Sequence, residues 1–295
     1  MTTRACRPIP AAMLVAMVGL GACSAREEAP PVAAMSLTIS KDRAPLGAPL
    51  DLTYRFEPLA PIEGDYRVFA HVVAPDGTLM WTDDHDPQPP TSTWRPGEPI
   101  EYQRTVFIPL FPYLGDATIR MGLHRGSERL PLSGGQPGEP GVDERAYAVG
   151  SLHLLPQSES IFLIYGSGWH PAEYSADDPT RSWQWTEKSA LLTFRNPRRD
   201  VTLYLQYDAR ADLFGETPQQ VTVIAGTRAI ETFAAAETHT MLRRIPLSTN
   251  DLDMDDMVEL RLLIDRTFSP ARTQSSSTDL RELGVRVYHV YVEPR

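Results

Sequence analysis

Aromatic and charged side chains that could bind a sugar gather in the second half of the chain. Trp183 and Trp185 are two residues apart, so on a β-strand both indoles point to one face of the sheet. Pyranose rings stack their C–H faces on indole, and charged side chains bind the hydroxyl groups. Trp169, Glu173 and Arg181 are close in sequence. These five residues therefore predict a carbohydrate-binding site, with Arg181 as a hydroxyl donor.

The same tryptophans could instead be structural. Tryptophan near the start of a strand often fills the core of a β-sandwich, and Glu173 could serve only to neutralise an arginine. The exposure of Trp183 and Trp185 separates the two interpretations, because a buried indole cannot stack on a sugar. We also expect Arg281 to pair with Glu173 or Asp279, which would tie the last strand to the loop that opens this region.

A second cluster of polar side chains lies in the loop from Trp81 to Pro87. It contains Asp83, Asp84, His85 and Asp86. Calcium binds carboxylate and carbonyl oxygens, but this spacing is not that of an EF-hand and the loop contains no glycine. We therefore expect a solvated loop, or side chains that cap their own backbone amides, and no metal site.

Catalytic motifs are absent from the sequence. There is no Gly-x-Ser-x-Gly elbow, no His-Glu-x-x-His and no phosphate-binding Gly-x-x-x-x-Gly-Lys-Ser/Thr loop. Two separated carboxylates can hydrolyse glycosides, yet chance pairs are expected among 38 acidic residues. We predict a protein that is not an enzyme and has no catalytic residue or cofactor; a glycan-active hydrolase remains an alternative.

The N-terminus has the pattern of an export signal. Arg4 and Arg7 precede an apolar run from Ala11 to Leu20 that is too short to span a bilayer. The sequence Leu-Gly-Ala-Cys that ends at Cys23 resembles the lipobox of bacterial lipoproteins, whose signal is cut before the cysteine and whose cysteine is acylated. The resemblance implies a signal peptide over residues 1–22 and lipid attachment, such as palmitate, at Cys23.

Charge and cysteine content limit the partners. The net charge is −10, and it becomes −12 once residues 1–22 with their two arginines are removed. An acidic chain without a basic cluster argues against nucleic acid and against docking on anionic lipids by charge. Cys6 lies in the signal, so the mature chain would contain no disulfide, and its membrane attachment would depend on the lipid.

Hydrophobic residues alternate along most of the mature chain with a period of two. Leu52, Tyr54 and Phe56 are one such run, and Leu260, Leu262 and Ile264 are another. Short alternating runs separated by turn residues are typical of an all-β sandwich. Pro75-Asp76-Gly77 predicts a hairpin turn. The last run, from Val285 to Val292, changes phase near Tyr288, which predicts a β-bulge or burial on both faces.

Two regions resemble known modules. Residues 36–155 combine a Pro-Asp-Gly turn, Asp-x-His-x-Pro, Thr-x-x-Trp-x-Pro-Gly and Gly-Leu-His, and this order resembles an immunoglobulin-like accessory domain of bacterial envelope and glycosyltransferase-related proteins. Residues 160–292 resemble a C-terminal β-sandwich of bacterial glycosyltransferases and phosphoglycerol-transferase-like proteins. The motifs of that second region are Gly168-Trp169, Glu173, Trp185-Thr186, Phe268-Ser269-Pro270 and 279–285. Both resemblances imply accessory, non-catalytic sandwiches.

Together these patterns predict an all-β chain of two tandem β-sandwiches, first immunoglobulin-like and then jelly-roll-like. The expected divisions are a signal at 1–22, a lipidated cysteine and flexible tether at 23–34, and sandwiches at 35–156 and 157–295. The expected function is a non-enzymatic lipoprotein of the bacterial envelope that acts with surface polysaccharide or a glycan-assembly complex. Ser24 after the cysteine favours the outer membrane where the host has one. A scaffolding lipoprotein that binds another protein at an open sheet edge is the other alternative.

Overall fold

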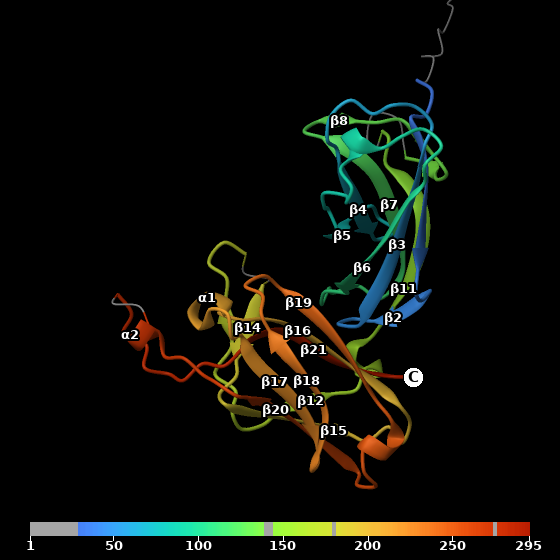
Figure 1. Ribbon diagram of the computed structural model, residues 1–295. Coiled ribbons are helices and arrows are strands. Elements are labelled where there is room, and N and C mark those ends of the chain that lie inside the picture. Colours follow the sequence, from blue (N-terminus) through green and yellow to red (C-terminus); the bar gives the residue numbers. More distant parts are fainter. Residues whose placement is uncertain (1–28, 139–143, 179–180, 274–275) are drawn as a thin grey trace, which may run out of the picture. The chain divides into compact units, whose positions relative to one another are not determined.

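The prediction of an all-β fold is confirmed by a computed structural model that describes residues 29–138, 144–178, 181–273 and 276–295 (Figure 1). Strands dominate, and neither of the two α-helices in these ranges exceeds four residues. The signal at 1–22 and Cys23 lie outside the described residues. Ala33 and Ala34, which the sequence assigned to the tether, already form the start of the first strand. In the described ranges no helix has the length and apolar character needed to cross a membrane.

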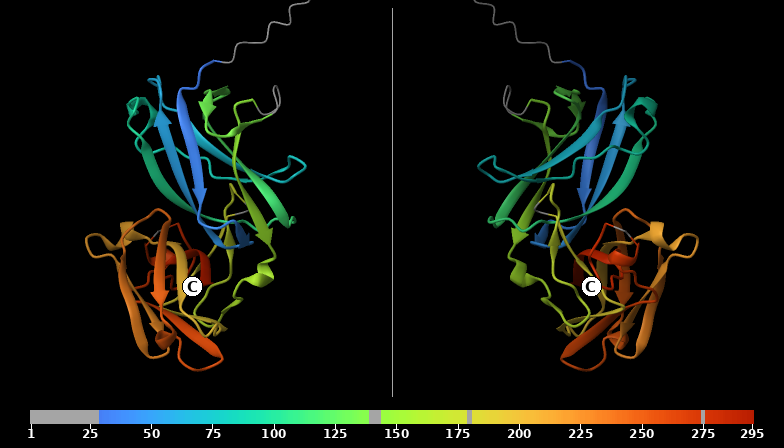
Figure 2. Two further views of the ribbon diagram at one scale, coloured as in Figure 1. Left: turned by 90° about the vertical axis from the view of Figure 1, so that its right-hand side faces the viewer. Right: turned by 90° about the vertical axis from the view of Figure 1, so that its left-hand side faces the viewer.

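The first half of the described chain forms two sheets, seen from two sides in the blue to green ribbon of Figure 2. One sheet has the order β6 (Ile100–Phe107), β3 (Pro49–Pro58), β1 (Ala33–Ile39) and β9 (Leu132–Ser133). The other has the order β10 (Gln136–Pro137), β11 (Tyr147–Leu155), β7 (Gly115–Arg125), β4 (Arg67–Val73) and β5 (Leu79–Thr82). β2 (Arg43–Pro45) pairs with β11, and β8 (Glu128–Arg129) pairs with β7.

This strand order is that of an immunoglobulin-like sandwich. β1, β3 and β6 take the places of strands A, B and E, while β4, β7 and β11 take those of C, F and G. β5 extends the second sheet beside β4, as an added strand does in variable-type domains. The predicted hairpin turn joins β4 to β5: Gly77 has φ +84°, and the Asp76 carboxylate accepts a hydrogen bond from the Thr78 amide at 2.9 Å.

The core of this sandwich follows the predicted alternation. Leu52, Tyr54 and Phe56 on β3 are all at most 4% exposed, as are Ile119, Met121 and Leu123 on β7. Because successive side chains of a strand point to opposite faces, each run places one row of apolar side chains between the sheets. Burying such rows is the main source of stability here, since the mature chain would contain no disulfide.

A polar network closes one side of the core, and here the expectation of a solvated loop is wrong. Asp83 and His85 are 8% and 7% exposed. Asp83 accepts two hydrogen bonds of 2.8 Å from Arg104 on β6 and one of 2.9 Å from the Tyr54 hydroxyl. The Nε2 atom of the His85 ring lies 2.8 Å from the Tyr102 hydroxyl. Burial opposes ionisation of Asp83, but Arg104 outweighs it and keeps the pKa of Asp83 below its usual value.

The second half of the described chain forms two five-stranded sheets. One has the order β12 (Leu163–Tyr165), β15 (Ser189–Arg195), β20 (Met257–Ile264), β17 (Gln219–Ala225) and β18 (Arg228–Ala235). The other has the order β13 (Glu173–Tyr174), β14 (Ser182–Trp185), β21 (Arg286–Pro294), β16 (Val201–Asp208) and β19 (Met241–Leu247). All these pairings are antiparallel, and the second core lies between the two sheets.

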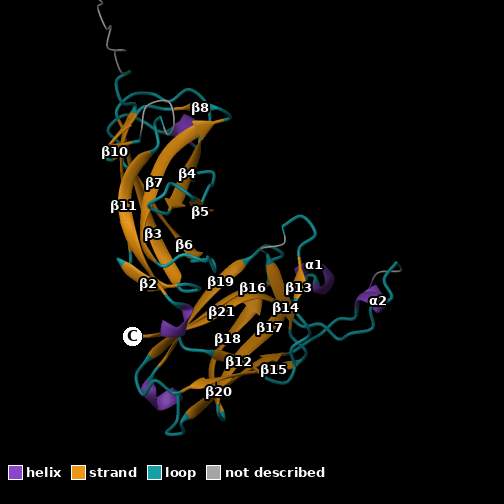
Figure 3. Cartoon of the chain, turned by 180° about the vertical axis from the view of Figure 1, so that it is seen from behind, coloured by secondary structure: helices purple, strands orange, loops and turns teal. Residues whose placement is uncertain are grey.

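The strand order of this half is that of a jelly roll. If β14 to β21 are counted as strands one to eight, the sheets read 1-8-3-6 and 2-7-4-5, the arrangement of two interlocked Greek keys. β13 and β12 each extend an edge. Short helical segments lie between the strands, as Figure 3 shows. In this half they are α1 (Ala211–Phe214), α2 (Pro270–Thr273) and the 3-10 turns Gln157–Glu159 and Thr249–Asp251, and a further 3-10 turn, Thr91–Thr93, lies in the first half.

We predict that Arg104→Met lowers the free energy of unfolding by about 2 kcal/mol, because it leaves the buried Asp83 carboxylate without its cation. Urea unfolding of the full chain measures this as a lower midpoint at unchanged m-value. Arg55→Met is the matched control, since the Arg55–Glu101 pair on neighbouring strands is half exposed and its loss should cost less than about 0.5 kcal/mol. Equal effects of the two substitutions would contradict the role given to the network.

Candidate functional site

The predicted change of phase in the last strand is a β-bulge, and it shapes the outer face of the jelly roll. On β21, Val287 pairs with Tyr207 of β16 and His289 pairs with Gln206, so Tyr288 is the extra residue. Val285, Val287 and Val290 remain in the core. Arg286 and Tyr288 therefore both point away from the core, toward the outer face of the sheet.

A buried ion pair fixes this outer face. β21 lies between β14 and β16, and Arg286 is opposite Trp185 on one side and Asp208 on the other. Its guanidinium makes a bidentate contact with Asp208, at 2.8 and 2.5 Å, and Asp208 is only 3% exposed. The Tyr288 hydroxyl donates to the same carboxylate at 2.6 Å. Burial opposes the charge of Arg286, but Asp208 more than offsets this and raises its pKa.

Aromatic rings surround the Arg286 guanidinium. Its central carbon lies 5.1 Å from the ring centre of Trp183, 5.2 Å from that of Tyr288 and 5.6 Å from that of Trp185. A cation at such distances from an indole or phenol face is attracted by the ring's negative centre. Arg286 therefore holds three rings in place around one charge. We call the group of Trp183, Arg286, Tyr288 and Arg181 the aromatic face.

Trp185 does not belong to the part of this face that a ligand could reach. It is 8% exposed and packs edge-on against Phe268, with ring centres 5.6 Å apart. Leu283 completes this small cluster, and Leu213 and Phe214 of α1 pack against it. The sequence-based assignment of Trp185 as a sugar contact is thus corrected: its indole belongs to a small core under α1.

Trp169 is also separate from the aromatic face. Its indole nitrogen donates to the Leu191 carbonyl at 2.8 Å, and its ring meets Tyr165 edge-on at 4.9 Å, so it packs toward β12 and β15 of the other sheet. Gly168 makes this approach possible: its φ is +81°, and a Cβ there would lie 1.8 Å from the Ser189 carbonyl oxygen. Trp169 is half-buried and positions the loop that leads to β13.

Glu173 and Trp183 do come together. They are opposite each other in the β13–β14 pair, and the Trp183 indole donates to a Glu173 carboxylate oxygen at 3.0 Å. Trp183 is half-buried, and it also packs against the small cluster that contains Trp185. It meets Tyr288 edge-on, with ring centres 6.1 Å apart. The structure therefore supports the exposure condition for Trp183 and not for Trp185.

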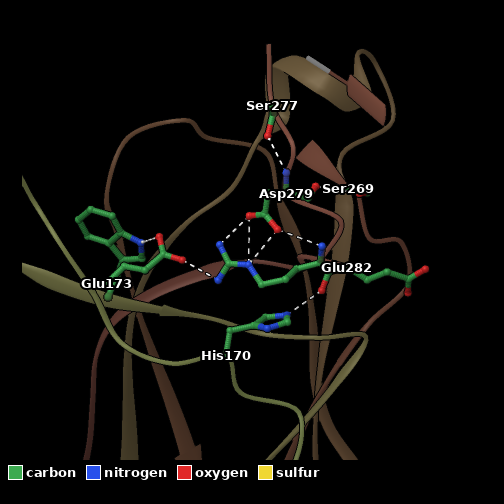
Figure 4. A network of polar contacts seen from close by, with 8 residues as sticks. His170, Glu173, Ser269, Ser277, Asp279 and Glu282 are labelled. Carbon is green, nitrogen blue, oxygen red and sulfur yellow. Dashed lines mark hydrogen bonds and ion pairs between the residues drawn. The ribbon is translucent and has the colours of Figure 1, made fainter. Parts of the chain in front are cut away.

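The predicted pairing of Arg281 is present with both partners at once (Figure 4). Arg281 contacts Glu173 at 2.7 Å and holds Asp279 through several hydrogen bonds of 2.7 to 3.0 Å. Hydrogen bonds from the Arg281 side chain and backbone amide lower the pKa of Asp279 to about 2. Arg281 thus links the chain segment before β21 to β13, as expected, although the three side chains are about one-third exposed rather than buried.

A surface pocket opens on the other side of Arg281. Its volume is 530 Å³, within the range of small-ligand sites. His170 donates from Nε2 to the Glu282 carbonyl at 2.9 Å, which fixes the ring at the pocket wall (Figure 4). The side chains that line the pocket include cations, carboxylates and a hydroxyl group, and this combination suits a ligand with many hydroxyl groups. We call it the Arg281 pocket; it is lined by His170, Glu187, Lys188, Ser189, Arg281 and Glu282.

Arg181 lies at the opposite end of the aromatic face. Its guanidinium carbon is 4.7 Å from the ring centre of Tyr288, and it donates to the Thr240 hydroxyl at 3.1 Å. Arg181 itself is exposed. The site is therefore a row that runs from the Arg281 pocket through Glu173 and Trp183 to Tyr288 and Arg181.

The carboxylates of this row do not have the features of an acid–base pair. Glu173 and Asp279 both hold Arg281, and the lowered pKa of Asp279 is opposite to that of a general acid. Within the described ranges, no three His, Cys, Asp or Glu side chains converge as metal ligands would.

Sequence reasoning found three of the residues in this row, Glu173, Arg181 and Trp183, and missed several others. Arg286, Tyr288 and Asp208 escaped because they lie more than 20 residues from the tryptophans along the chain. The change of phase at Tyr288 was the available signal, since a bulge re-aims side chains to the outer face. His170 and Lys188 carry no pattern that would mark them as pocket residues.

Comparisons with known proteins give no family for this chain. No family model matches it, and no curated protein matches it. Among solved structures it is similar to a β-glucuronidase of Bacteroides uniformis, at 8% identity and a TM-score of 0.28, over 88% of this chain and 30% of that one. It is also similar to the CBM51-2 and INT domains of Clostridium perfringens ZmpB, at 8% identity and a TM-score of 0.26, over 62% and 38%.

A third similarity, to the DNA glycosylase AlkC of Pseudomonas fluorescens, has 16% identity and a TM-score of 0.24 over 35% of this chain and 31% of that one. The chain thus aligns with about a third of the length of each of these structures. Resemblances this distant say nothing about ligands.

We predict that Glu173 and Arg281 are energetically coupled. Arg281→Met should lower the free energy of unfolding by about 1 kcal/mol, less than a buried pair would cost, because water screens these half-exposed groups. In a double-mutant cycle with Glu173→Gln, urea unfolding should give a coupling energy of about 0.5 to 1 kcal/mol. Strictly additive effects would show that the contact contributes nothing to stability.

Proposed function

We propose that this chain is a non-catalytic glycan-binding lipoprotein of the bacterial cell envelope. The observation that carries the proposal is the row of the Arg281 pocket, Glu173 and the half-buried Trp183 on one side of the jelly roll. A sugar on Trp183 would stack its apolar face on the indole, while the pocket would bind the hydroxyl groups of a neighbouring sugar. Cys23 would attach the protein to the membrane through its lipid.

The pre-organised side chains favour binding of a ligand over a purely structural role. Trp183 is held by Glu173 and by the Arg286 cation, and Arg281 is held by two carboxylates. A ligand would therefore meet rotamers that are already fixed, which reduces the entropy lost on binding.

We predict that Trp183→Ala weakens glycan binding by about tenfold or more, because it removes the stacking surface. An array of bacterial envelope polysaccharides probed with the full chain in detergent measures this. Trp81→Ala is the matched control, since Trp81 is a half-buried tryptophan of the other sandwich and should leave binding unchanged. The absence of binding to every polysaccharide would refute the proposal.

Attachment to the membrane has its own test. We predict that Cys23→Ser moves the protein from the membrane fraction to the soluble fraction or leaves it unprocessed, because no other cysteine remains after residue 22. Fractionation followed by mass measurement of the mature N-terminus checks this. A Cys23→Ser protein that is processed and still sediments with membranes would contradict lipid attachment.

A second candidate, a scaffold that binds another protein, has one observation in its favour. Ile164 on the edge strand β12 (46% exposed) and Phe162 just before this strand (80%) lie beside a 530 Å³ pocket that Met257 and Arg195 also line. An extended peptide could add to this edge and place apolar side chains in the pocket. In that case Ile164→Lys, and not Trp183→Ala, would abolish partner binding.

A further inference from the structure

The row contains three arginines, Arg181, Arg281 and Arg286, and two of them are neutralised by the protein itself. Arg286 is paired with Asp208, and Arg281 is shared between Glu173 and Asp279. A carboxylate that already neutralises a cation leaves little net field for a ligand. Neither of these two arginines is therefore free to select a charged ligand.

Arg181 differs from both. Its described contacts are the π face of Tyr288 and the hydroxyl of Thr240, both uncharged, and across the described ranges it has no ion pair with a carboxylate. Asp208, the carboxylate below Tyr288, is buried and bonded to Arg286 and to the Tyr288 hydroxyl. Arg181 thus presents an exposed positive charge at the end of the row, with no ion-paired carboxylate among the described residues.

The position of this charge matters because the chain as a whole is acidic. With a net charge of −10, the protein's overall field repels anions, so an anion would gain little by binding at an arbitrary place. At Arg181, a guanidinium can form a bidentate, charge-assisted contact with a carboxylate or a phosphate. Tyr288 holds the guanidinium plane in place through the stacking contact.

We propose that the glycan bound along this row is acidic, and that its carboxylate or phosphate group pairs with Arg181 while a sugar ring stacks on Trp183. The inference depends on the proposed glycan-binding function and adds the ligand class. Trp183 and Arg181 both contact Tyr288, so the stacking surface and the cation adjoin the same ring. Trp183 supplies affinity for the ring, and Arg181 supplies selectivity for the charge.

The test compares native polysaccharides with the same polysaccharides after their charge is removed. Carboxyl reduction converts uronates to neutral sugars, and dephosphorylation by hydrogen fluoride removes phosphate, so the two treatments distinguish the two anions. The full chain in detergent should bind the native form about tenfold or more tightly than one of the two treated forms. Arg181→Gln should remove this preference and leave the weaker binding to the neutral form, whereas Arg181→Lys should retain part of the preference.

Arg266→Gln is the matched control, because Arg266 also lies over an aromatic ring, that of Phe214, in the same sandwich. It should leave the preference unchanged, and thermal melts should show that all three variants are folded. Binding that is equal for native and neutralised glycans, or a preference that survives Arg181→Gln, would overturn the inference while the glycan-binding function stands. If the unmodified protein bound none of the glycans, the proposed function itself would be overturned.

Discussion

The contact between Arg286 and Asp208 is the interaction on which the outer face of the jelly roll depends. An ion pair with a 3% exposed carboxylate is costly to desolvate, and it persists because both side chains find all their partners: two hydrogen bonds between them, a third from Tyr288, and three rings around the cation. These hydrogen bonds and ring contacts fix the positions of Trp183 and Tyr288. Without the cation, the interaction that positions the three rings around one point would be lost, and so would the geometry of the row that ends at Arg181.

The bulge in β21 connects sequence to this arrangement. In a regular strand the side chains would alternate throughout, so Val290 would point outward like Arg286 and Tyr288. The extra residue at Tyr288 shifts the alternation and lets Val287 and Val290 both reach the core. The core therefore stays continuous while the outer face gains a residue. A similar division holds in the immunoglobulin-like sandwich, where Tyr54 lies in the row of core residues on β3 and still donates a hydrogen bond to the buried Asp83. In both sandwiches, polar pairs occupy positions at the margin of a core that apolar alternation builds.

Much of the fold could be predicted from sequence because alternation is a local signal. The runs on β3, β7 and β20, the hairpin after Val73 and the bulge at Tyr288 each depend on residues within about ten positions of one another. The Arg281 pairing was also predictable, because Asp279 is two residues away in sequence and Glu173 is the acidic residue of the segment that opens this region. The burial of Asp83 and His85 was not predictable, because the cation that makes it possible, Arg104, comes from a strand about 20 residues further along the chain.

Trp185 shows why a local pattern identifies a face but not its exposure. Its spacing from Trp183 correctly predicts that the two indoles share one side of the sheet, and both do approach Arg286. What separates them is the extent of cover: Trp185 lies within the cluster with Phe268 and Leu283, whereas Trp183 lies at the margin of that cluster beside Glu173 and is only half-buried. The α1 segment and the Phe268 loop join strands whose order is fixed by the jelly-roll topology, so they set which indole is buried. Ligand access on this face is therefore a property of the connections, and the strands supply only the residues that those connections cover or leave open.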